Sequence, residues 1–237
     1  MEDFLPLRLS SSFSGNPEIF PEIRLLVFQY GRTLLCMAMK VYGITNVKGG
    51  AGKTHATVHL AWQAAAHGQR VAVLDLDPTR QSVNWVELAG LGIPALHIDI
   101  KQADLEGYIA QLRADGDFDA IFIDTPANDR DASLETLMVS DVAIIPVGVG
   151  TSDTGMLGTT ERQVKRAMQL RPELQPYILI NRAKFAPARE RETVADCEKT
   201  GFPVLRARVP LRGDYQAAAG KTPDGFHYAE VWKEVNA

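Results

Sequence analysis

Cysteine is scarce in this chain of 237 residues, and its scarcity excludes several classes of protein. The two cysteines, Cys36 and Cys197, cannot build a disulfide framework, and no Cys-x-x-Cys pair indicates a zinc site. An iron–sulfur cluster for electron transfer in a protein of this kind requires cluster-ligating cysteines from each subunit, which the positions of these two cysteines exclude. Cys36 precedes the regular part of the chain, and Cys197 lies in a late predicted helix. This cysteine usage is typical of a reducing cytoplasm, where we expect the protein to work.

The chain also lacks a long apolar run. Its most apolar early stretch, Leu25–Met39, is short and interrupted by polar residues, so no transmembrane span is expected. A secretory signal is not expected either, because Glu2 and Asp3 stand where such a signal carries basic residues.

An overall positive charge is lacking as well. The formal net charge of −4 argues against a protein that binds nucleic acid in every state. The charge is uneven, however, since residues 161–212 carry twelve Lys and Arg against six Asp and Glu. This basic second half is compatible with contacts to DNA phosphates, and equally with an ordinary solvated helix face.

What the sequence does contain is a regular alternation of short β-branched runs and longer amphipathic stretches from Lys40 onward. The pattern predicts an α/β fold with a doubly wound, mostly parallel sheet flanked by helices. In such sheets the ligand lies beyond the carboxyl ends of the strands. Predicted strands are Lys40–Asn46, Arg70–Asp75, Ala95–Ile100, Asp119–Asp124, Asp141–Val147, Tyr177–Asn181 and Val204–Val209. Predicted helices begin near Gly52, Arg80, Ala103, Ala132, Thr154, Ala188, Asp214 and His227.

Residues 1–38 do not fit this alternation and form an N-terminal extension. One interpretation is that translation starts at Met37 or Met39, so that the extension is misassigned or disordered. The other is a helix over Glu22–Met37 that packs on the domain. The domain itself is predicted to span residues 39–237.

A glycine-rich segment, VKGGAGKTHAT, follows the first predicted strand and opens a helix. Gly49, Gly50 and Gly52 allow a tight turn in which several backbone N–H groups point at phosphate oxygens. The helix N-terminus adds partial positive charge. Lys53 is placed to reach the β- and γ-phosphates of a nucleotide, and Thr54 offers its hydroxyl to Mg²⁺.

The generic phosphate-loop pattern GxxxxGK[ST] is not satisfied, because Val47 occupies its first glycine position. The sequence instead satisfies K-G-G-x-G-K-T, which resembles the deviant Walker A loop of the ParA/MinD ATPases. The resemblance implies that Lys48 crosses an ATP-sandwiched homodimer interface and contacts the partner's phosphates. His55 departs from the family, which usually has a second Thr there. Either an imidazole N–H replaces the lost contact to the α-phosphate, or the nucleotide binds more weakly.

Two carboxylates, Asp75 and Asp77, close the second predicted strand in VAVLDLDPTRQS. The two-residue period of a strand predicts that both lie on the same side. By resemblance to the family's DxDP segment, Asp77 orients or activates the attacking water, and Asp75 supports either Mg²⁺ or the loop. A helix N-cap or turn is the alternative for each. Thr79 replaces a Gln that the family often has.

A third carboxylate, Asp124, ends the apolar run in FDAIFIDTPAN, a pattern typical of a Walker B strand. Such a strand presents one carboxylate to the hydration shell of the metal. The predicted Mg²⁺ site is therefore Thr54, Asp75 and Asp124. By the same resemblance, residues 125–127 form a second switch that senses the γ-phosphate.

The nucleotide base is expected in the C-terminal half. By resemblance Asn181 contacts adenine, since a side-chain amide offers both a donor and an acceptor; a loop cap is the alternative. Pro210 and Arg212 stand in a later segment that resembles the family's base-covering loop. The predicted catalytic residues are Lys48, Lys53 and Asp77. The predicted ATP-binding residues are Lys48, Gly49, Gly50, Ala51, Gly52, Lys53, Thr54, His55, Asn181, Pro210 and Arg212.

The resemblance implies an ATPase with ATP and Mg²⁺ as cofactors. The first functional hypothesis is partition of plasmid or chromosomal DNA. In it the ATP-bound homodimer binds DNA non-specifically on the nucleoid, and a ParB-like adaptor stimulates hydrolysis. The alternative is a MinD-like positioning or assembly ATPase that acts on a non-DNA cargo. No membrane anchor is expected, because the last predicted helix carries acidic polar positions and an apolar stripe of Tyr228, Val231, Trp232 and Val235.

Overall fold

The computed structural model describes residues 39–183, 187–210, 219–223 and 226–237. The chain divides into two units, residues 1–37 and 38–237, and the description below concerns the second unit alone. The extension 1–38 and the helix predicted near Asp214 lie outside the described residues.

All seven predicted strands are present, and they form one sheet in the order β3-β2-β4-β1-β5-β6-β7. Every neighbouring pair is parallel. The sheet is therefore wholly parallel along its described length, where the sequence predicted a mostly parallel one. The strands are β1 Lys40–Ile44, β2 Val71–Asp75, β3 Ala95–His97, β4 Ala120–Asp124, β5 Val142–Gly148, β6 Gln175–Ala183 and β7 Val204–Pro210.

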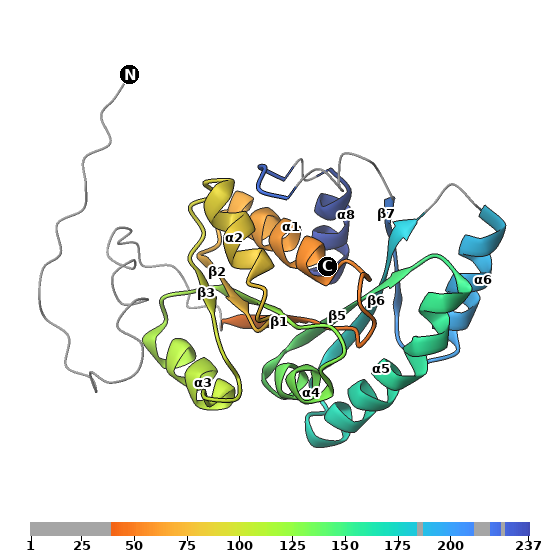
Figure 1. Cartoon of the computed structure of the whole chain (residues 1–237), viewed down its shortest axis with the longest axis horizontal. Coiled ribbons are helices and arrows are strands. Elements are labelled where there is room, and N and C mark those ends of the chain that lie inside the picture. The colour runs from red at the N-terminus through yellow and green to blue at the C-terminus, as the bar shows by residue number, and fades with distance from the viewer. Residues whose placement is uncertain (1–38, 184–186, 211–218, 224–225) are drawn as a thin grey trace, which may run out of the picture. The chain divides into compact units, whose positions relative to one another are not determined.

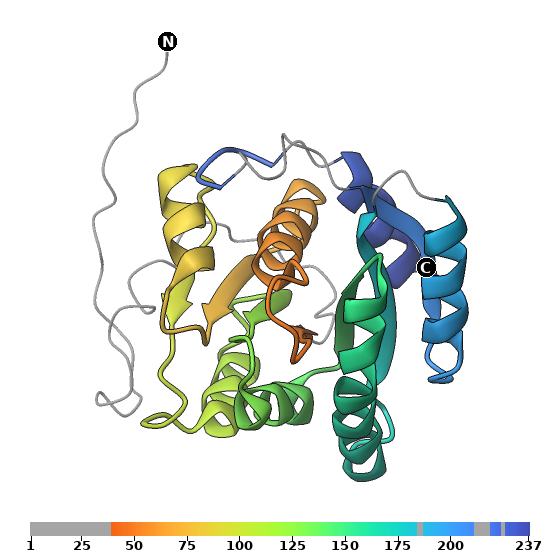
Figure 2. The same cartoon turned by 45° about the vertical axis from the view of Figure 1, so that its right-hand side comes forward.

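Helices cover both faces of this sheet (Figures 1 and 2). Helices α1, α2 and α8 lie on one face, and α3, α4, α5 and α6 lie on the other. The helices that connect strands in the direction of β3 lie in the first layer, and those that connect strands in the direction of β7 lie in the second. Right-handed crossovers require this arrangement. The helices are α1 Lys53–Ala66, α2 Gln81–Leu88, α3 Leu105–Asp115, α4 Arg130–Val139, α5 Thr151–Leu170, α6 Pro187–Glu198 and α8 Phe226–Val235.

The central strands are largely apolar because both faces of the sheet are covered. Every residue of β2, β4 and β5 is buried. Under the α1 layer, the Tyr42 and Phe122 rings stack with centroids 4.8 Å apart, and Trp232 of α8 tilts against both. The buried sheet thus supports the loops that leave its carboxyl edge.

Helix α8 docks on the domain through the predicted apolar stripe. Tyr228 and Val231 are fully buried, and Trp232 and Val235 are 5% exposed. The prediction that this helix packs on the core is confirmed. Across the described parts of the chain, none of the helices has the length and hydropathy that a membrane crossing requires.

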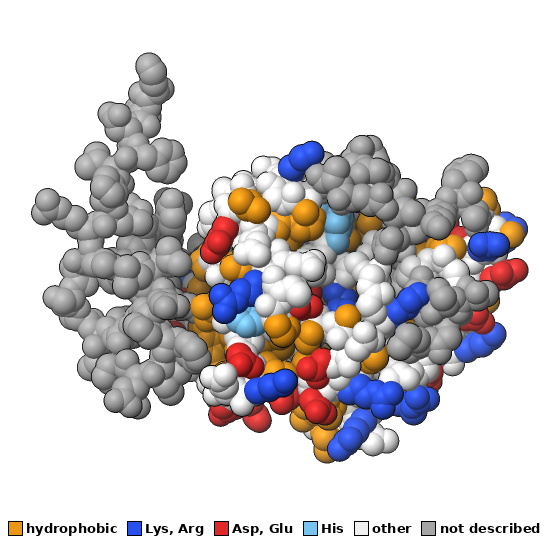
Figure 3. Space-filling model, in the orientation of Figure 1, with side chains coloured by type: hydrophobic (Ala, Val, Ile, Leu, Met, Phe, Trp, Pro, Cys, Tyr) orange, Lys and Arg blue, Asp and Glu red, His pale blue; other side chains and the backbone are white. Residues whose placement is uncertain are grey.

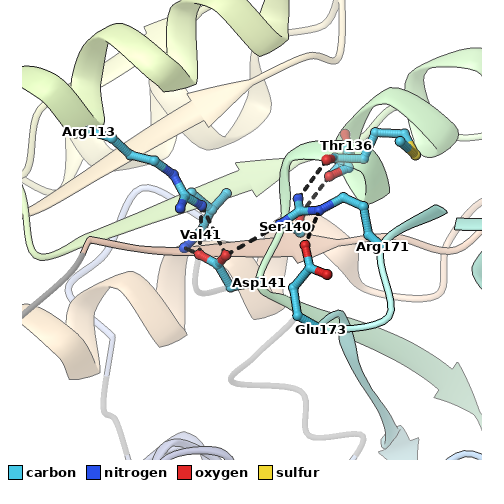
Figure 4. A network of polar contacts seen from close by, with 8 residues as sticks. Val41, Arg113, Thr136, Ser140, Asp141, Arg171 and Glu173 are labelled. Carbon is cyan, nitrogen blue, oxygen red and sulfur yellow. Dashed lines mark hydrogen bonds and ion pairs between the residues drawn. The ribbon is translucent and has the colours of Figure 1, made fainter. Parts of the chain in front are cut away.

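A polar network ties the amino edge of the sheet together, opposite the site (Figure 4). The Asp141 carboxylate accepts a hydrogen bond from the Val41 backbone N–H at 2.8 Å and pairs with Arg113 at 2.9 Å. Arg171 lies 3.6 Å from the same carboxylate and also pairs with Glu173 at 2.8 Å. These contacts join β1, α3 and the end of α5 at the start of β5.

Candidate nucleotide site

A cleft of about 610 Å³ opens at the carboxyl edge of the sheet, where α1 leaves toward one face and the loops after β4 and β5 leave toward the other. A parallel sheet binds ligands at this kind of crevice. Most of the predicted site residues meet here, together with residues of α2 and of segment 219–220. The cleft is lined by Gly50, Gly52, Lys53, Thr54, His55, Asp77, Gln81, Asn84, Trp85, Leu88, Thr125, Ala127, Asn181, Val209, Pro210, Ala219 and Gly220.

The glycine-rich loop ends in a left-handed residue that starts α1. Gly52 is the N-cap of α1, with φ 89°, a conformation that favours glycine. No side chain caps α1, whereas the Asp104 and Asp129 carboxylates cap α3 and α4. The first N–H groups of α1 therefore point to the cleft, where a phosphate can accept their hydrogen bonds.

Lys53 is held inside this loop. It is 7% exposed, and its Nζ lies 3.4 Å from the Lys48 carbonyl oxygen. Burial lowers the pKa of the Lys53 ammonium, while the carboxylates of Asp124 and Asp77 oppose that shift. The ammonium is thus a poorly solvated donor beside the place where phosphate charge would lie.

The half-buried Lys48 has its backbone fixed by a residue that the sequence analysis did not single out. The Lys48 N–H donates to the Asn46 side-chain oxygen at 2.9 Å. The Asn46 amide in turn donates to the Pro146 carbonyl oxygen of β5 at 2.8 Å. The signal in the sequence was a polar residue between β1 and the glycines. The carbonyl group that its amide contacts, that of Pro146, is 100 residues away in the chain.

Asp124 is a fully buried carboxyl at the end of β4. Burial raises its pKa to about 8, the neighbouring Asp75 adds to the shift, and the Thr54 hydroxyl and Lys53 ammonium only partly offset it. Neither Asp124 oxygen has a hydrogen-bond partner of good geometry among the described residues. A carboxylate in this position favours a cation as its partner.

Asp75 has a different environment. Its Oδ1 accepts from the Asp77 backbone N–H at 2.9 Å, and its Oδ2 accepts from the N–H groups of Ser82 at 2.9 Å and Val83 at 3.3 Å. These bonds hold the loop after β2 and the start of α2. They favour the loop-supporting role over metal coordination for Asp75.

The predicted same-side placement of Asp75 and Asp77 relied on strand alternation, but β2 ends at Asp75, so alternation does not determine where Asp77 points. Asp77 belongs to the following loop, where its Oδ1 accepts from the N–H and the hydroxyl of Thr79 at 2.9 and 2.7 Å. It still reaches the cleft wall.

Asn181 lies at the end of β6 in the cleft, where its amide donates to the Ala51 carbonyl oxygen at 3.0 Å. This contact ties β6 to the phosphate loop, so the loop-capping alternative describes one of its roles. Contact with adenine remains a prediction. Pro210 also lines the cleft, and Arg212 lies outside the described residues.

His55 packs in an aromatic cluster that joins three helices. Its Nδ1 lies 3.1 Å from the Tyr228 hydroxyl, and its ring stacks on His59 with centroids 4.2 Å apart. The Trp85 ring makes T-shaped contacts with both imidazole rings. The residue that departs from the family pattern thus links α1 to α8 and α2.

The α2 wall of the cleft was missed by the sequence analysis. Gln81, Asn84, Trp85 and the 78% exposed Leu88 contribute to it, and the Trp85 indole N–H donates to the Lys221 carbonyl oxygen at 2.8 Å. No pattern in the sequence marks these residues, because their placement depends on how α2 packs beside α1.

The fold and this site together define a P-loop nucleotide-binding domain. The chain belongs to the family described as the CobQ/CobB/MinD/ParA nucleotide binding domain, which matches residues 42–222. Within that family it is an ATPase of the ParA/MinD type, as the resemblance of its glycine-rich segment to the deviant Walker A loop implied.

Two curated relatives and one solved structure illustrate the similarity. The "Maintenance of carboxysome distribution protein A" of Halothiobacillus neapolitanus is 25% identical over 177 residues, covering 74% of this chain and 81% of that protein. The "Sporulation initiation inhibitor protein Soj" of Bacillus subtilis is 30% identical over 146 residues, covering 60% and 49%. A Cyanothece McdA–ATP complex superposes with a TM-score of 0.63 at 17% identity, covering 84% and 95% of the two chains.

The family is a nucleotide-binding domain, and the residues of this site fit ATP and Mg²⁺. The uncapped start of α1 suits phosphate. The Asp124 oxygens, which have no hydrogen-bond partner of good geometry among the described residues, suit a hydrated cation. No group of three His, Cys, Asp or Glu within the described ranges could hold a metal by itself. That agrees with Mg²⁺, which takes one or two protein oxygens and completes its shell with phosphates and water.

Proposed function

We propose that this ATPase works as a nucleotide-switched homodimer that binds DNA non-specifically in its ATP state and serves DNA partition. A ParB-like adaptor then stimulates hydrolysis and release. The observation that carries the proposal is the deviant Walker A loop, in which the half-buried Lys48 precedes exposed glycines, in one domain with a face of exposed arginines.

We assign the site residues roles from their positions and, for Lys48, from the resemblance of the loop to the ParA/MinD family. The uncapped N–H groups of α1 and the buried Lys53 ammonium bind the β- and γ-phosphates. Thr54 and Asp124 hold the hydrated Mg²⁺, which neutralises phosphate charge. Asp77, on the cleft wall, orients the attacking water. Lys48 extends from the loop entrance to the nucleotide of the partner subunit.

The arginine face lies on α5 and α6 and at β7. Lys and Arg side chains gather over α5 in Figure 3. Several cations of this region are neutralised, as in the pairs Lys165–Glu161 at 2.7 Å and Arg208–Glu190 at 3.2 Å. Among the described residues of α5, α6 and β7, the exposed arginines with no carboxylate partner are Arg162, Arg166, Arg189, Arg191 and Arg206. A sequence-independent contact with DNA needs such clustered, unneutralised cations.

A second candidate is a positioning ATPase for a protein assembly. It is favoured by the carboxysome-distribution relatives, one of which aligns with 74% of this chain. The nucleotide switch is the same in both candidates, and only the cargo differs.

The test is duplex DNA binding with ATP, ADP or no nucleotide across a salt series. We expect binding with ATP alone, weakening steeply with salt. The double variant Arg162→Ala/Arg166→Ala should bind more weakly and with a shallower salt slope. Lys101→Ala, an exposed cation remote in sequence from α5 and α6, is the matched control. Intact ATP-driven dimerisation without DNA binding in any state would reject the DNA proposal and favour the second candidate.

A further inference from the structure

A buried hydrogen-bond network connects the entrance of the phosphate loop to α5. The Asn46 side-chain oxygen accepts from the Lys48 N–H and also from the Thr160 hydroxyl, at 2.9 and 3.2 Å. The Thr160 hydroxyl oxygen accepts in turn from the Val47 N–H at 3.3 Å. Asn46 and Thr160 are each 1% exposed, so water does not compete for these bonds.

The same short segment also contacts Asn128, the residue directly after the predicted second switch at 125–127. The Val47 carbonyl oxygen accepts from the Asn128 N–H at 2.9 Å. Asn128 has φ 59° in the loop that follows Asp124, a conformation uncommon for a non-glycine residue. The backbone of Val47 is thus hydrogen-bonded to α5 through its N–H and to the loop after Asp124 through its C=O.

Thr160 stands out on the buried side of α5. Its buried neighbours on that side, Leu157, Val164 and Ala167, are apolar and belong to the core between α5 and the sheet. A hydroxyl is costly in such a core unless it is hydrogen-bonded. Thr160 therefore holds α5 to one specific arrangement of residues 46–48, which apolar packing alone does not select.

The opposite side of α5 carries the proposed DNA-binding arginines. Arg162 and Arg166 follow Thr160 by two and six residues and are exposed. Since α5 is a continuous helix from 151 to 170, a shift of residues 46–48 at Thr160 also moves these arginines.

We propose that Asn46 and Thr160 are positioning residues that couple the loop bearing Lys48, and the switch after Asp124, to the DNA-binding face of α5. ATP binding changes the position of the loop, the network transmits that change to α5, and the affinity for DNA changes. The proposal rests on the proposed function, because it explains how that function would be regulated.

The variant that tests the network is Thr160→Val, which keeps the side-chain shape and removes the hydroxyl. Thr160→Ser keeps the hydroxyl and is the matched control. Thermal unfolding establishes that both variants fold, and titration with a fluorescent ATP analogue establishes that both bind nucleotide.

The first measurement is hydrogen exchange of the α5 amides with ATP and with ADP, which does not involve DNA. We expect ATP to change the exchange of residues 161–170 in the parent protein and in Thr160→Ser, and to have no such effect in Thr160→Val. An equal ATP effect in all three proteins, or no effect in any, overturns the proposal.

The second measurement is the ratio of DNA affinities with ATP and with ADP. The network predicts that this ratio falls by about tenfold or more in Thr160→Val and is kept in Thr160→Ser. A ratio in Thr160→Val equal to that of the parent overturns the coupling. A parent protein that never binds DNA rejects the proposed function instead, and hydrogen exchange then decides the coupling alone.

Discussion

Asp75 and Asp124 end neighbouring parallel strands at directly paired positions, yet only one of the two carboxylates is satisfied by the protein. Asp75 accepts three backbone hydrogen bonds, and Asp124 has no partner of good geometry among the described residues. Their adjacency raises the pKa of Asp124 further beyond the effect of burial. Asp75 stabilises the loop after β2, and Asp124 is available to bind a cation.

The first prediction contrasts the two in nucleotide-free protein. Asp124→Asn should leave the free energy of unfolding unchanged or raised, because it removes a buried carboxyl whose ionised form is disfavoured. Asp75→Asn should lower that free energy by about 2–4 kcal/mol, since it presents an amide to backbone donors. Urea unfolding measures both values.

For Asp124→Asn, the effect on activity should be opposite to the effect on stability. Asp124→Asn should lose magnesium-dependent hydrolysis while it remains folded. A strongly destabilised Asp124→Asn together with a fully stable Asp75→Asn would reverse the assignment of the two residues.

The fold could be predicted because its determinants are local. Apolar runs such as AIFID and VAIIPV, separated by amphipathic stretches, predicted the buried central strands of a parallel sheet. Boundaries shifted by a few residues, as where α5 begins at Thr151 and not near Thr154, since capping geometry decides them.

The sequence placed residues at the site where they form contiguous motifs and, by resemblance, also Asn181 and Pro210, which line the cleft. The glycine-rich loop and the carboxylates after β2 and β4 are contiguous motifs. The contacts of Asn46 with Thr160, and of His55 with Tyr228, span 114 and 173 residues and have no sequence pattern. Such pairs depend on tertiary packing, which one sequence does not display.

The second prediction separates the two lysines of the loop. Lys53→Ala should abolish nucleotide binding, because the buried ammonium beside the phosphates is lost. Lys48→Ala should bind ATP as a monomer and fail to dimerise, because its proposed contact lies across the dimer interface. Equilibrium binding and analytical ultracentrifugation with ATP measure both effects. An ATP-dependent dimer formed normally by Lys48→Ala would contradict the proposed role of Lys48.

The third prediction concerns Asp77. Asp77→Ala should still bind ATP and should accumulate as the ATP-bound dimer, since the loop keeps its Asp75 bonds while the water-orienting carboxylate is lost. Phosphate release and sedimentation with ATP are the measurements. Thr79→Ala, which removes the hydroxyl that donates to Asp77, is the control and should reduce hydrolysis less. Hydrolysis by Asp77→Ala at the parent rate would reject this assignment.

The fourth prediction is a pH dependence due to His59. Burial lowers the pKa of His59 to about 3, and the neighbouring His55 contributes. The folded-state pKa is thus below the unfolded value of about 6.5, so stability is lost as the pH falls from about 6.5 toward 3.

His59→Phe keeps an aromatic ring in the stack and removes the titrating group. Between pH 7.5 and 5.0, the free energy of unfolding of the parent should fall by about 2 kcal/mol more than that of His59→Phe. The exposed His67, replaced by Gln, is the control and should follow the parent. Parallel pH profiles for the parent and His59→Phe would show that His59 does not carry this dependence.

The fifth prediction concerns the edge of the sheet at β7, which has no strand beyond it within the described residues. The Glu234 carboxylate of α8 accepts hydrogen bonds from the backbone N–H groups of Arg206 and Ala207 at 2.7 and 2.9 Å. A charged side chain that occupies edge N–H groups prevents another strand from pairing there. Glu234→Ala should therefore lower the free energy of unfolding by about 1–2 kcal/mol and promote self-association at high protein concentration. Glu230→Ala, an exposed change on the same helix, should do neither, so equal behaviour of the two variants in urea unfolding and light scattering would reject this role for Glu234.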